Sequence, residues 1–388
     1  MRFELFSALL PSGRRIVFIG GFVAAVATLA ACLSPTPNGQ RASEPAPNVD
    51  VYLMVDTSPS MEIAGTSDGM ASLEAATKLN ELGCAFGCHQ SNPSDQGDFR
   101  AADGGDIKCA TSGVYADATT FDAGATFPRA GRDNYDLAHC LGVALRIDLV
   151  RDAVRNLVKT AAKAEEADGA AYRMALFETD TNQPNPANDL DLHTLQPLTG
   201  DLRPGGVADT AASNIAAMET YRNNWRAEDL FDFDMDTFLD ADIVAIDRLM
   251  PVPGTGAHGP DDRPEEVLMI VSDGLNDQTP RRTYAPMDWS GVNCSQIKKR
   301  GVRIAVLYTT YVPMTGDMWY TAQVAPALPK GLPLGLPPST PVGADPMALA
   351  MQQCASPGLY AKVGLDGDIS AAMQGLFRRA VRAPRQAG

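Results

Sequence analysis

The chain has 388 residues, of which 45% are hydrophobic and 20% are charged, so it can bury a substantial core and is not disordered throughout. Its formal net charge of −15 argues against nucleic acid or an anionic membrane surface as the main partner, since both are bound through basic patches. The length suits one large domain with insertions, or two domains.

The first 32 residues have the pattern of an export signal. Arg14 and Arg15 precede a short apolar stretch, and small residues then lead to Cys32. The ending Leu-Ala-Ala-Cys resembles a bacterial lipoprotein signal, in which Cys32 becomes the lipidated first residue. The alternative is a single uncleaved membrane helix, for which the segment 16–31 is short. In either case we expect export and a membrane anchor at the N-terminus, with residues 33–48, rich in Pro, Ser and Asn, as an extended linker.

A buried strand is predicted directly after this linker. Val51–Val55 is an apolar run with a valine at each end and without polar alternation, which favours a strand covered on both faces of a parallel sheet. Asp56, Ser58 and Ser60 follow at alternate positions. In open α/β sheets the ligand site lies at the carboxyl ends of the strands, and these three side chains are hard oxygen donors suited to a divalent cation. The simpler alternative is a turn that only caps the next helix.

The next segment combines a helix with a cysteine-rich insertion. A helix is predicted over 71–82, and the stretch from about 83 to 140 then has too few large apolar residues to form its own core. Six cysteines follow Cys32, and an even number in an exported chain predicts disulfides. Because these cysteines lie in two separate regions of the sequence, we expect the last two to form a disulfide with each other and the first four to pair among themselves. The six are Cys84, Cys88, Cys109, Cys140, Cys294 and Cys354.

One pair of these cysteines, Cys84 and Cys88, is followed by His89, as in haem c attachment motifs. Three residues separate the cysteines instead of the usual two, and the exported context favours disulfides over haem or zinc.

Helices and strands alternate through the rest of the chain. Apolar periodicity predicts helices over 141–164, 211–221, 238–249, 294–300, 347–354 and 369–381, and apolar runs predict strands over 172–177, 190–198, 265–272, 303–308 and 359–363. This alternation predicts an α/β fold with a doubly wound, mostly parallel sheet flanked by helices. The alternating aspartates at 232, 234 and 236 lack the glycine and the glutamate of a calcium loop, so we interpret them as an acidic helix start.

The strand predicted over 265–272 shows the same pattern as the first one, an apolar run followed by polar residues. It is followed by Asp273 and Gly274, so a second aspartate stands at the carboxyl end of a buried strand. Two such aspartates predict one cation between the two loops.

These residues resemble the von Willebrand factor A (VWA) family, whose metal-ion-dependent adhesion site uses Asp-x-Ser-x-Ser, a Thr on a second loop and an Asp on a third. Asp56, Ser58 and Ser60 match the first loop, and Asp273 matches the third. Thr237 is assigned to the second loop because it precedes a predicted helix just before the second strand; Thr199, Thr210 and Thr255 are the alternatives. The resemblance implies a VWA domain over 49–382 that holds Mg²⁺, Mn²⁺ or Ca²⁺.

Further stretches resemble one branch of that family, the TadG-like proteins of tight-adherence (Flp) pilus assembly. They lie at 83–89, 145–151, 305–311 and 354–358. Members of that branch usually begin with a membrane helix, whereas this chain begins with a lipoprotein-type signal.

Three functions follow for comparison. The first is a non-enzymatic, envelope-anchored domain on the periplasmic side or cell surface. It binds the carboxylate of a protein partner through the cation, in pilus assembly or adhesion, with pilus components as partners. The second is a metal-dependent phosphoryl-transfer or hydrolytic enzyme. For an aspartyl-phosphate enzyme, a second carboxylate would be expected where Ser58 stands. The third is a structural envelope protein with an empty metal loop.

Overall fold

The computed structural model of the protein describes residues 47–77, 85, 107–114, 120–127, 134–179, 192–215, 239–257, 262–278, 281–284, 294–317, 320–328 and 345–382. Several residues singled out in the sequence therefore lie outside the described residues, among them Cys32, Cys84, Cys88, His89, Thr237 and the aspartates at 232, 234 and 236. The segment 16–31, predicted to belong to an export signal or, alternatively, to an uncleaved membrane helix, lies outside them too. Among the helices in the described ranges, none combines the length and the apolar character that a membrane span requires.

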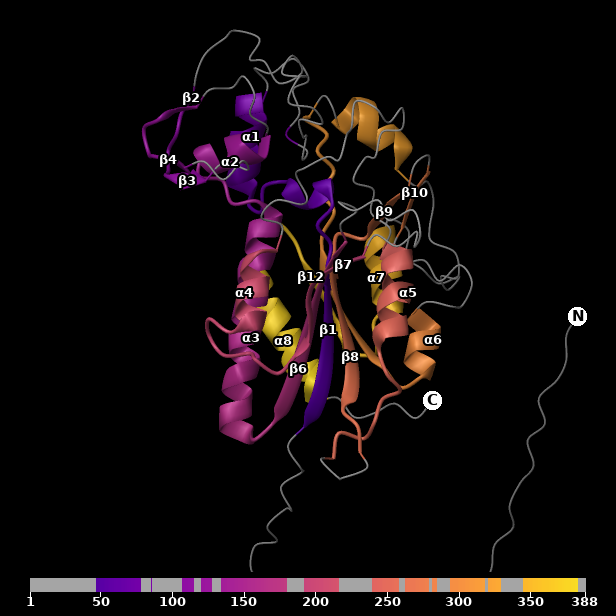
Figure 1. The fold of residues 1–388 in the computed structure, drawn as a ribbon. Helices are drawn as coiled ribbons and strands as arrows, with labels where there is room; N and C mark the ends of the chain where they lie inside the picture. The colour runs from indigo at the N-terminus through magenta and orange to yellow at the C-terminus, as the bar shows by residue number, and fades with distance from the viewer. Residues whose placement is uncertain are drawn as a thin grey trace, which may run out of the picture. The chain divides into compact units, whose positions relative to one another are not determined.

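A six-stranded sheet forms the centre of the described part of the chain, in the order β12-β11-β8-β1-β6-β7 (Figure 1). All neighbouring strands run parallel except β7, which pairs antiparallel with β6 at the edge of the sheet. The prediction of a mostly parallel, doubly wound sheet is thus confirmed. The strands are β1 (Asn48–Val55), β6 (Ala171–Thr179), β7 (Leu192–Thr199), β8 (Glu265–Ser272), β11 (Arg303–Thr309) and β12 (Tyr360–Val363).

The direction of winding reverses between two central strands. From β1 the chain continues to β6 on one side, and later strands are added on the other side through β8. The boundary between β1 and β8 is therefore the topological switch point. In open α/β sheets, ligands bind at this point, at the carboxyl ends of the strands. Both strands are buried from their second residue onward, as their apolar sequences predict.

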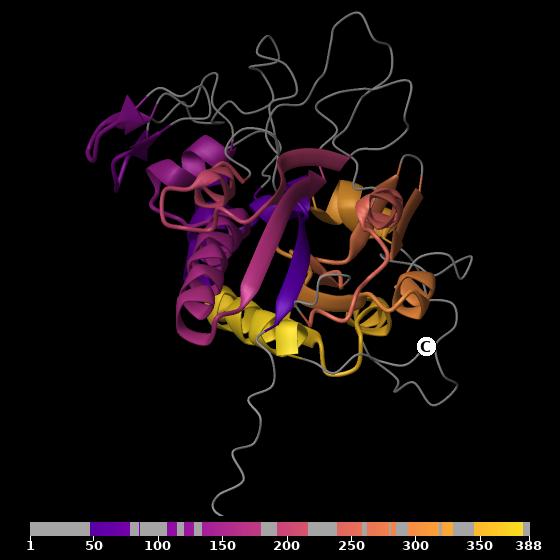
Figure 2. The ribbon, with the colours of Figure 1, turned by 60° about the horizontal axis from the view of Figure 1, so that its bottom comes forward.

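Helices cover both faces of the sheet (Figures 1 and 2). On one face, the ring of Tyr172 meets that of Phe377 edge-on at 5.4 Å, which packs α8 against β6. The helices on this face are α3 (Arg146–Asp168), α4 (Val207–Ser213) and α8 (Ile369–Arg382). The opposite face carries α5 (Leu239–Leu249), α6 (Cys294–Lys299) and α7 (Pro346–Cys354).

Short elements complete the described chain. Helices α1 (Ser67–Thr77) and α2 (Asn134–Cys140) lie at the end of the sheet where β1 finishes (Figure 1). A hairpin of β9 (Leu275–Gln278) and β10 (Arg281–Tyr284), not predicted from the sequence, follows β8. Short 3-10 turns span Pro59–Glu62 and Ala325–Ala327, and a short π-helix spans Tyr320–Val324.

Several predicted helix boundaries were wrong. Helix α3 begins at Arg146 instead of 141, because Gly142 has a φ of 73° and the extended residue Leu145 caps the helix. It ends at Asp168, before a left-handed Gly169 and four residues beyond the predicted end at 164. Helix α1 starts four residues before the predicted position, and α4 begins at Val207, also four residues early.

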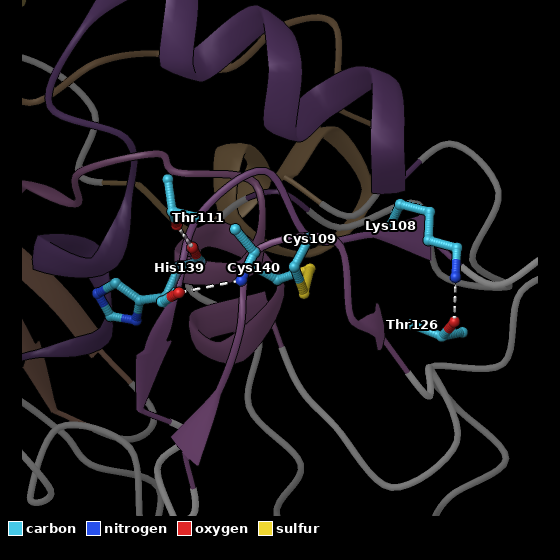
Figure 3. Close-up of a disulfide and its surroundings, with 8 residues drawn as sticks. Lys108, Cys109, Thr111, Thr126, His139 and Cys140 are labelled. Atoms are coloured by element: carbon cyan, nitrogen blue, oxygen red, sulfur yellow. Dashed lines mark hydrogen bonds between the residues drawn. A yellow bond between two sulfur atoms is a disulfide. The ribbon is translucent and has the colours of Figure 1, made fainter.

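The cysteine-rich insertion is held by a disulfide in its described part. Cys109 is bonded to Cys140 at the end of α2, and the Ala110 N–H donates to the Cys140 carbonyl at 2.7 Å (Figure 3). The Thr111 hydroxyl also donates to the carbonyl of His139 at 2.9 Å. Two pairs of two-residue strands lie nearby, β2 (Ile107–Lys108) with β5 (Thr126–Phe127) and β3 (Gly113–Val114) with β4 (Thr120–Phe121). A covalent bond and local hydrogen bonds thus replace a larger core here.

A second disulfide joins Cys294 to Cys354, the pairing expected from their positions. It connects the start of α6 to the end of α7 and closes a loop with a sequence separation of 60. Such a loop restricts the unfolded chain, so replacing both cysteines by serine is expected to lower the free energy of unfolding by about 2–4 kcal/mol. Urea unfolding of the variant beside its parent measures this loss. Equal stability of the two proteins would contradict it.

Candidate metal site

The two strand-end aspartates lie side by side at the switch point. The Asp56 N–H donates to the carbonyl of Val271 at 2.8 Å, which places Asp56 beside the end of β8. Asp273 follows that strand by one residue, and both aspartates have no exposed surface. Parallel pairing of β1 with β8 therefore brings together two carboxylates that are separated by more than two hundred residues in the sequence.

Hydrogen bonds fix the Asp56 carboxylate on both oxygens. Oδ1 accepts from the Ser58 N–H at 2.9 Å and lies 3.5 Å from the hydroxyl of Thr179. Oδ2 accepts from the Ser272 hydroxyl at 2.7 Å. The three donors come from the loop after β1 and from the ends of the two neighbouring strands, so the position of Asp56 is set by all three strand ends.

The serine hydroxyls of the first loop face the same site. Ser58 and Ser60 are buried, and their Oγ atoms lie 3.0 Å apart. The Ser60 hydroxyl also hydrogen-bonds the Asp273 carboxylate. The tight turn at Pro59–Glu62 folds the loop back so that alternate side chains point to one place. The structure thus brings Asp56, Ser58, Ser60 and Asp273 together, while their role as metal ligands stays a prediction.

Asp273 is held by its own loop and by a distant arginine. Its Oδ1 accepts from the Leu275 N–H at 3.3 Å, and its Oδ2 lies 3.4 Å from Nη1 of Arg146 at the start of α3. The next residue, Gly274, has a φ of 79°, a conformation that favours glycine. A Cβ at that position would lie 3.2–3.3 Å from atoms of Met351, Met347 and Tyr308, so α7 packs closely against the loop.

Burial and mutual repulsion raise the free energy of the two carboxylates in their charged form. Burial raises the pKa of Asp56, although hydrogen bonds from Ser272 and Ser58 oppose the rise. Burial also raises the pKa of Asp273, the negative charge of Asp56 raises it further, and the guanidinium of Arg146 partly opposes this. A divalent cation placed between the carboxylates would relieve both costs.

The donor set fits a hard cation. Two carboxylates and two hydroxyls provide only oxygen atoms, and Mg²⁺ typically takes one or two carboxylates and keeps several waters. In the part of the chain that the structure describes, no group of three or more His, Cys, Asp or Glu side chains is placed to hold a metal. A cation here would therefore depend on hydroxyl and water oxygens as well as on the two aspartates.

The alternatives for the threonine ligand lie elsewhere. Thr199 is the register partner of Met174, near the start of β6, whereas Asp56 lies beside its end. Thr255 precedes Gly256, which packs against Asn48, the first residue of β1. Thr210 lies in α4, which packs against α3 and β7. Thr237 lies outside the described residues, so its assignment stays a prediction.

Three residues around the site were missed in the sequence. Ser272 and Thr179 each end a strand next to β1, and the signal that revealed Asp273 would have found them: a polar residue at the end of an apolar run. Arg146 gives no such signal, since an arginine in the first turn of an amphipathic helix is ordinarily exposed.

The chain is similar to several solved structures at low sequence identity. No model of a known protein family matches, and none of the curated proteins does. Similar solved structures include the pilus adhesin SpaC from Lactobacillus rhamnosus GG, with 10% identity, 86% of this chain and 30% of that chain covered, and a TM-score of 0.40. The vWF domain of the type V pili tip protein Mfa5 from Porphyromonas gingivalis has 8% identity, with 88% and 98% covered and a TM-score of 0.37.

Proximal thread matrix protein 1 from the mussel byssus is also similar, with 10% identity, 87% of this chain and 49% of that chain covered, and a TM-score of 0.35. The chain thus spans half or less of the length of the mussel protein and of SpaC. At TM-scores below 0.5 these similarities add nothing to the fold assignment, which rests on the strand order and pairing described above.

Proposed function

We propose that this chain is a non-enzymatic domain of the cell envelope that binds a protein partner through a divalent cation. The observation that carries the proposal is the convergence of Asp56, Ser58, Ser60 and Asp273 at the switch point of the sheet. Two buried carboxylates without a cation oppose each other, whereas a cation would convert that repulsion into attraction.

The cation is proposed to be Mg²⁺, with Mn²⁺ or Ca²⁺ as substitutes. Thr237 would complete the protein ligands. The contact between the amide of Asn276 and the Asp240 carboxylate, at 3.4 Å, supports this assignment, because it brings the start of α5 to the loop that follows Asp273. Thr237 precedes Asp240 by three residues. A remaining coordination position would accept a carboxylate from the partner.

The burial of Asp56 supports binding over catalysis. A nucleophilic carboxylate must reach its substrate, but Asp56 has no exposed surface and both of its oxygens already accept hydrogen bonds. Cleavage of a generic phosphate ester in the presence of metal, lost on substitution of Asp56, would contradict the binding proposal.

The proposed location is the envelope, with Cys32 as the lipid anchor. The two disulfides support an oxidising compartment. A role in tight-adherence pilus assembly is proposed from the stretches shared with TadG-like proteins.

The direct test is a calorimetric titration of the metal-stripped, oxidised protein with Mg²⁺, Mn²⁺ and Ca²⁺. We expect one saturable site, and we expect Thr237→Ala to weaken it about tenfold or more through loss of a ligand. Thr255→Ala is the matched control, since Thr255 lies at the other end of the sheet, and it should leave the affinity unchanged. A protein that binds none of the three cations would instead support a structural role with an empty loop.

A further inference from the structure

A buried arginine stands beside the proposed cation site. Arg146 is only 3% exposed, and its Nη1 lies 3.4 Å from Oδ2 of Asp273. Its Nη2 donates to the carbonyl of Thr310 at 2.8 Å. The guanidinium also interacts electrostatically with Asp56. One permanent positive charge therefore faces both carboxylates of the site.

Backbone contacts hold this arginine in place. It is the first residue of α3, and its N–H donates to the carbonyl of Ile63 in the loop that carries the two serines. The preceding Leu145 N–H donates to Asp148 at 3.0 Å, and Asp148 is paired with His139 at 2.9 Å. The helix start is thus anchored to the metal loop on one side and to the cysteine-rich insertion on the other, so Arg146 has little freedom to leave.

The charge of the loaded site depends on Arg146. Two carboxylates and one divalent cation sum to zero, so the loaded site has no net charge that would favour an anion over a neutral oxygen ligand. The arginine changes that sum to +1, and burial keeps the charge poorly screened.

We propose that Arg146 is a specificity-determining residue that makes the metal-loaded site a net cation and so selects an anionic carboxylate over a neutral oxygen ligand. This rests on the proposed cation-dependent function. The same charge repels the metal itself, so Arg146 weakens cation binding and strengthens partner binding.

A merely structural role makes a different prediction. If Arg146 only neutralised Asp273 for folding, its removal would lower stability, and the affinities for the metal and for a carboxylate would fall together or stay unchanged. The proposed role requires the two affinities to move in opposite directions.

The test uses the full oxidised chain with Mn²⁺ as the metal. Free Mn²⁺ is measured by electron paramagnetic resonance, and acetate or acetamide binding to the loaded protein by the change in water proton relaxation. For Arg146→Met we expect Mn²⁺ to bind about tenfold or more tightly, and acetate about tenfold or more weakly, with acetamide unchanged. Arg146→Lys keeps the positive charge but not both contacts of the guanidinium, so for both ligands it should lie closer to the parent than Arg146→Met does.

If Arg146→Met does not fold, as judged by circular dichroism, the same measurements are made on Arg146→Gln. If both neutral variants fail to fold, the role of Arg146 is structural and the inference is overturned. Unchanged or parallel affinities overturn it too, but leave the proposed metal site standing. If the unsubstituted protein binds no Mn²⁺, the proposed function fails and the inference fails with it.

Discussion

Replacing Asp56 with asparagine is expected to lower the affinity for Mn²⁺ or Mg²⁺ at least about a hundredfold and to stabilise the metal-free protein. Loss of outer hydrogen-bonding partners of metal ligands commonly costs 10–100-fold, and Asp56 is proposed as a residue of the site itself. Asparagine also removes one of the two negative charges that attract the cation.

The opposite effect on stability has its own physical reason. In the metal-free protein the charge of Asp56 is buried and repelled by Asp273, so a neutral residue of the same shape removes a cost. The asparagine carbonyl can accept from the Ser58 N–H, and its amide can donate to the Ser272 hydroxyl, which already accepts from the Gly274 N–H at 2.9 Å. The fold should therefore tolerate the change.

Calorimetric titration measures the affinity, and thermal unfolding in a chelator measures the stability, where we expect a rise of a few degrees. Asp262→Asn is the matched control. It makes the same change of charge at an exposed loop whose carboxylate accepts from the N–H of Thr255, remote from the site. An Asp56→Asn protein that binds metal as tightly as the parent would exclude Asp56 from the site.

The central sheet and part of the candidate site could be predicted because both depend on short, local signals. Uninterrupted apolar runs such as 267–271 mark strands buried on both faces, and a polar residue after such a run must lie at the carboxyl edge of the sheet. Asp56 and Asp273 were found in this way, from residue type and position alone.

The remaining site residues and element boundaries depend on long-range contacts, which no local sequence pattern indicates. Arg146 reaches Asp273 across 127 residues of sequence, and its burial follows from where α3 begins. That start was placed too early because Leu141 and Leu145 share the helical spacing, while the left-handed Gly142 and the capping contact of Asp148 exclude them from the helix. The hairpin after β8 was missed because its short strands have no apolar alternation.

A second acidic pair, at the other end of the same strands, makes stability depend on pH. Glu266 on β8 is the register partner of Asp50 on β1, which in turn is the register partner of Arg173 on β6. Arg173 pairs with Asp50 through two hydrogen bonds, of 2.7 and 2.5 Å. Glu266 is 1% exposed, and neither of its side-chain oxygens has a hydrogen-bond partner within the described residues.

Burial, followed by the negative charge of Asp50, raises the pKa of Glu266 from 4.5 to about 8. The folded protein therefore holds a proton on Glu266 between these two values, whereas the unfolded chain has released it. The stabilisation from this proton is complete below about pH 4.5 and is lost as the pH rises to about 8.

Glu266→Gln should remove this dependence, because glutamine is neutral at every pH and its amide can donate to Asp50. We expect the variant to match the parent at pH 4.5 and to exceed its free energy of unfolding by roughly 2–4 kcal/mol at pH 8.5. Urea unfolding across this range measures both. The neighbouring Glu265→Gln is the control, since it breaks the 2.8 Å ion pair with the nearly buried Arg303 and should lower stability instead. A gain for Glu266→Gln of the same size at both pH values would show that Glu266 does not titrate in this window.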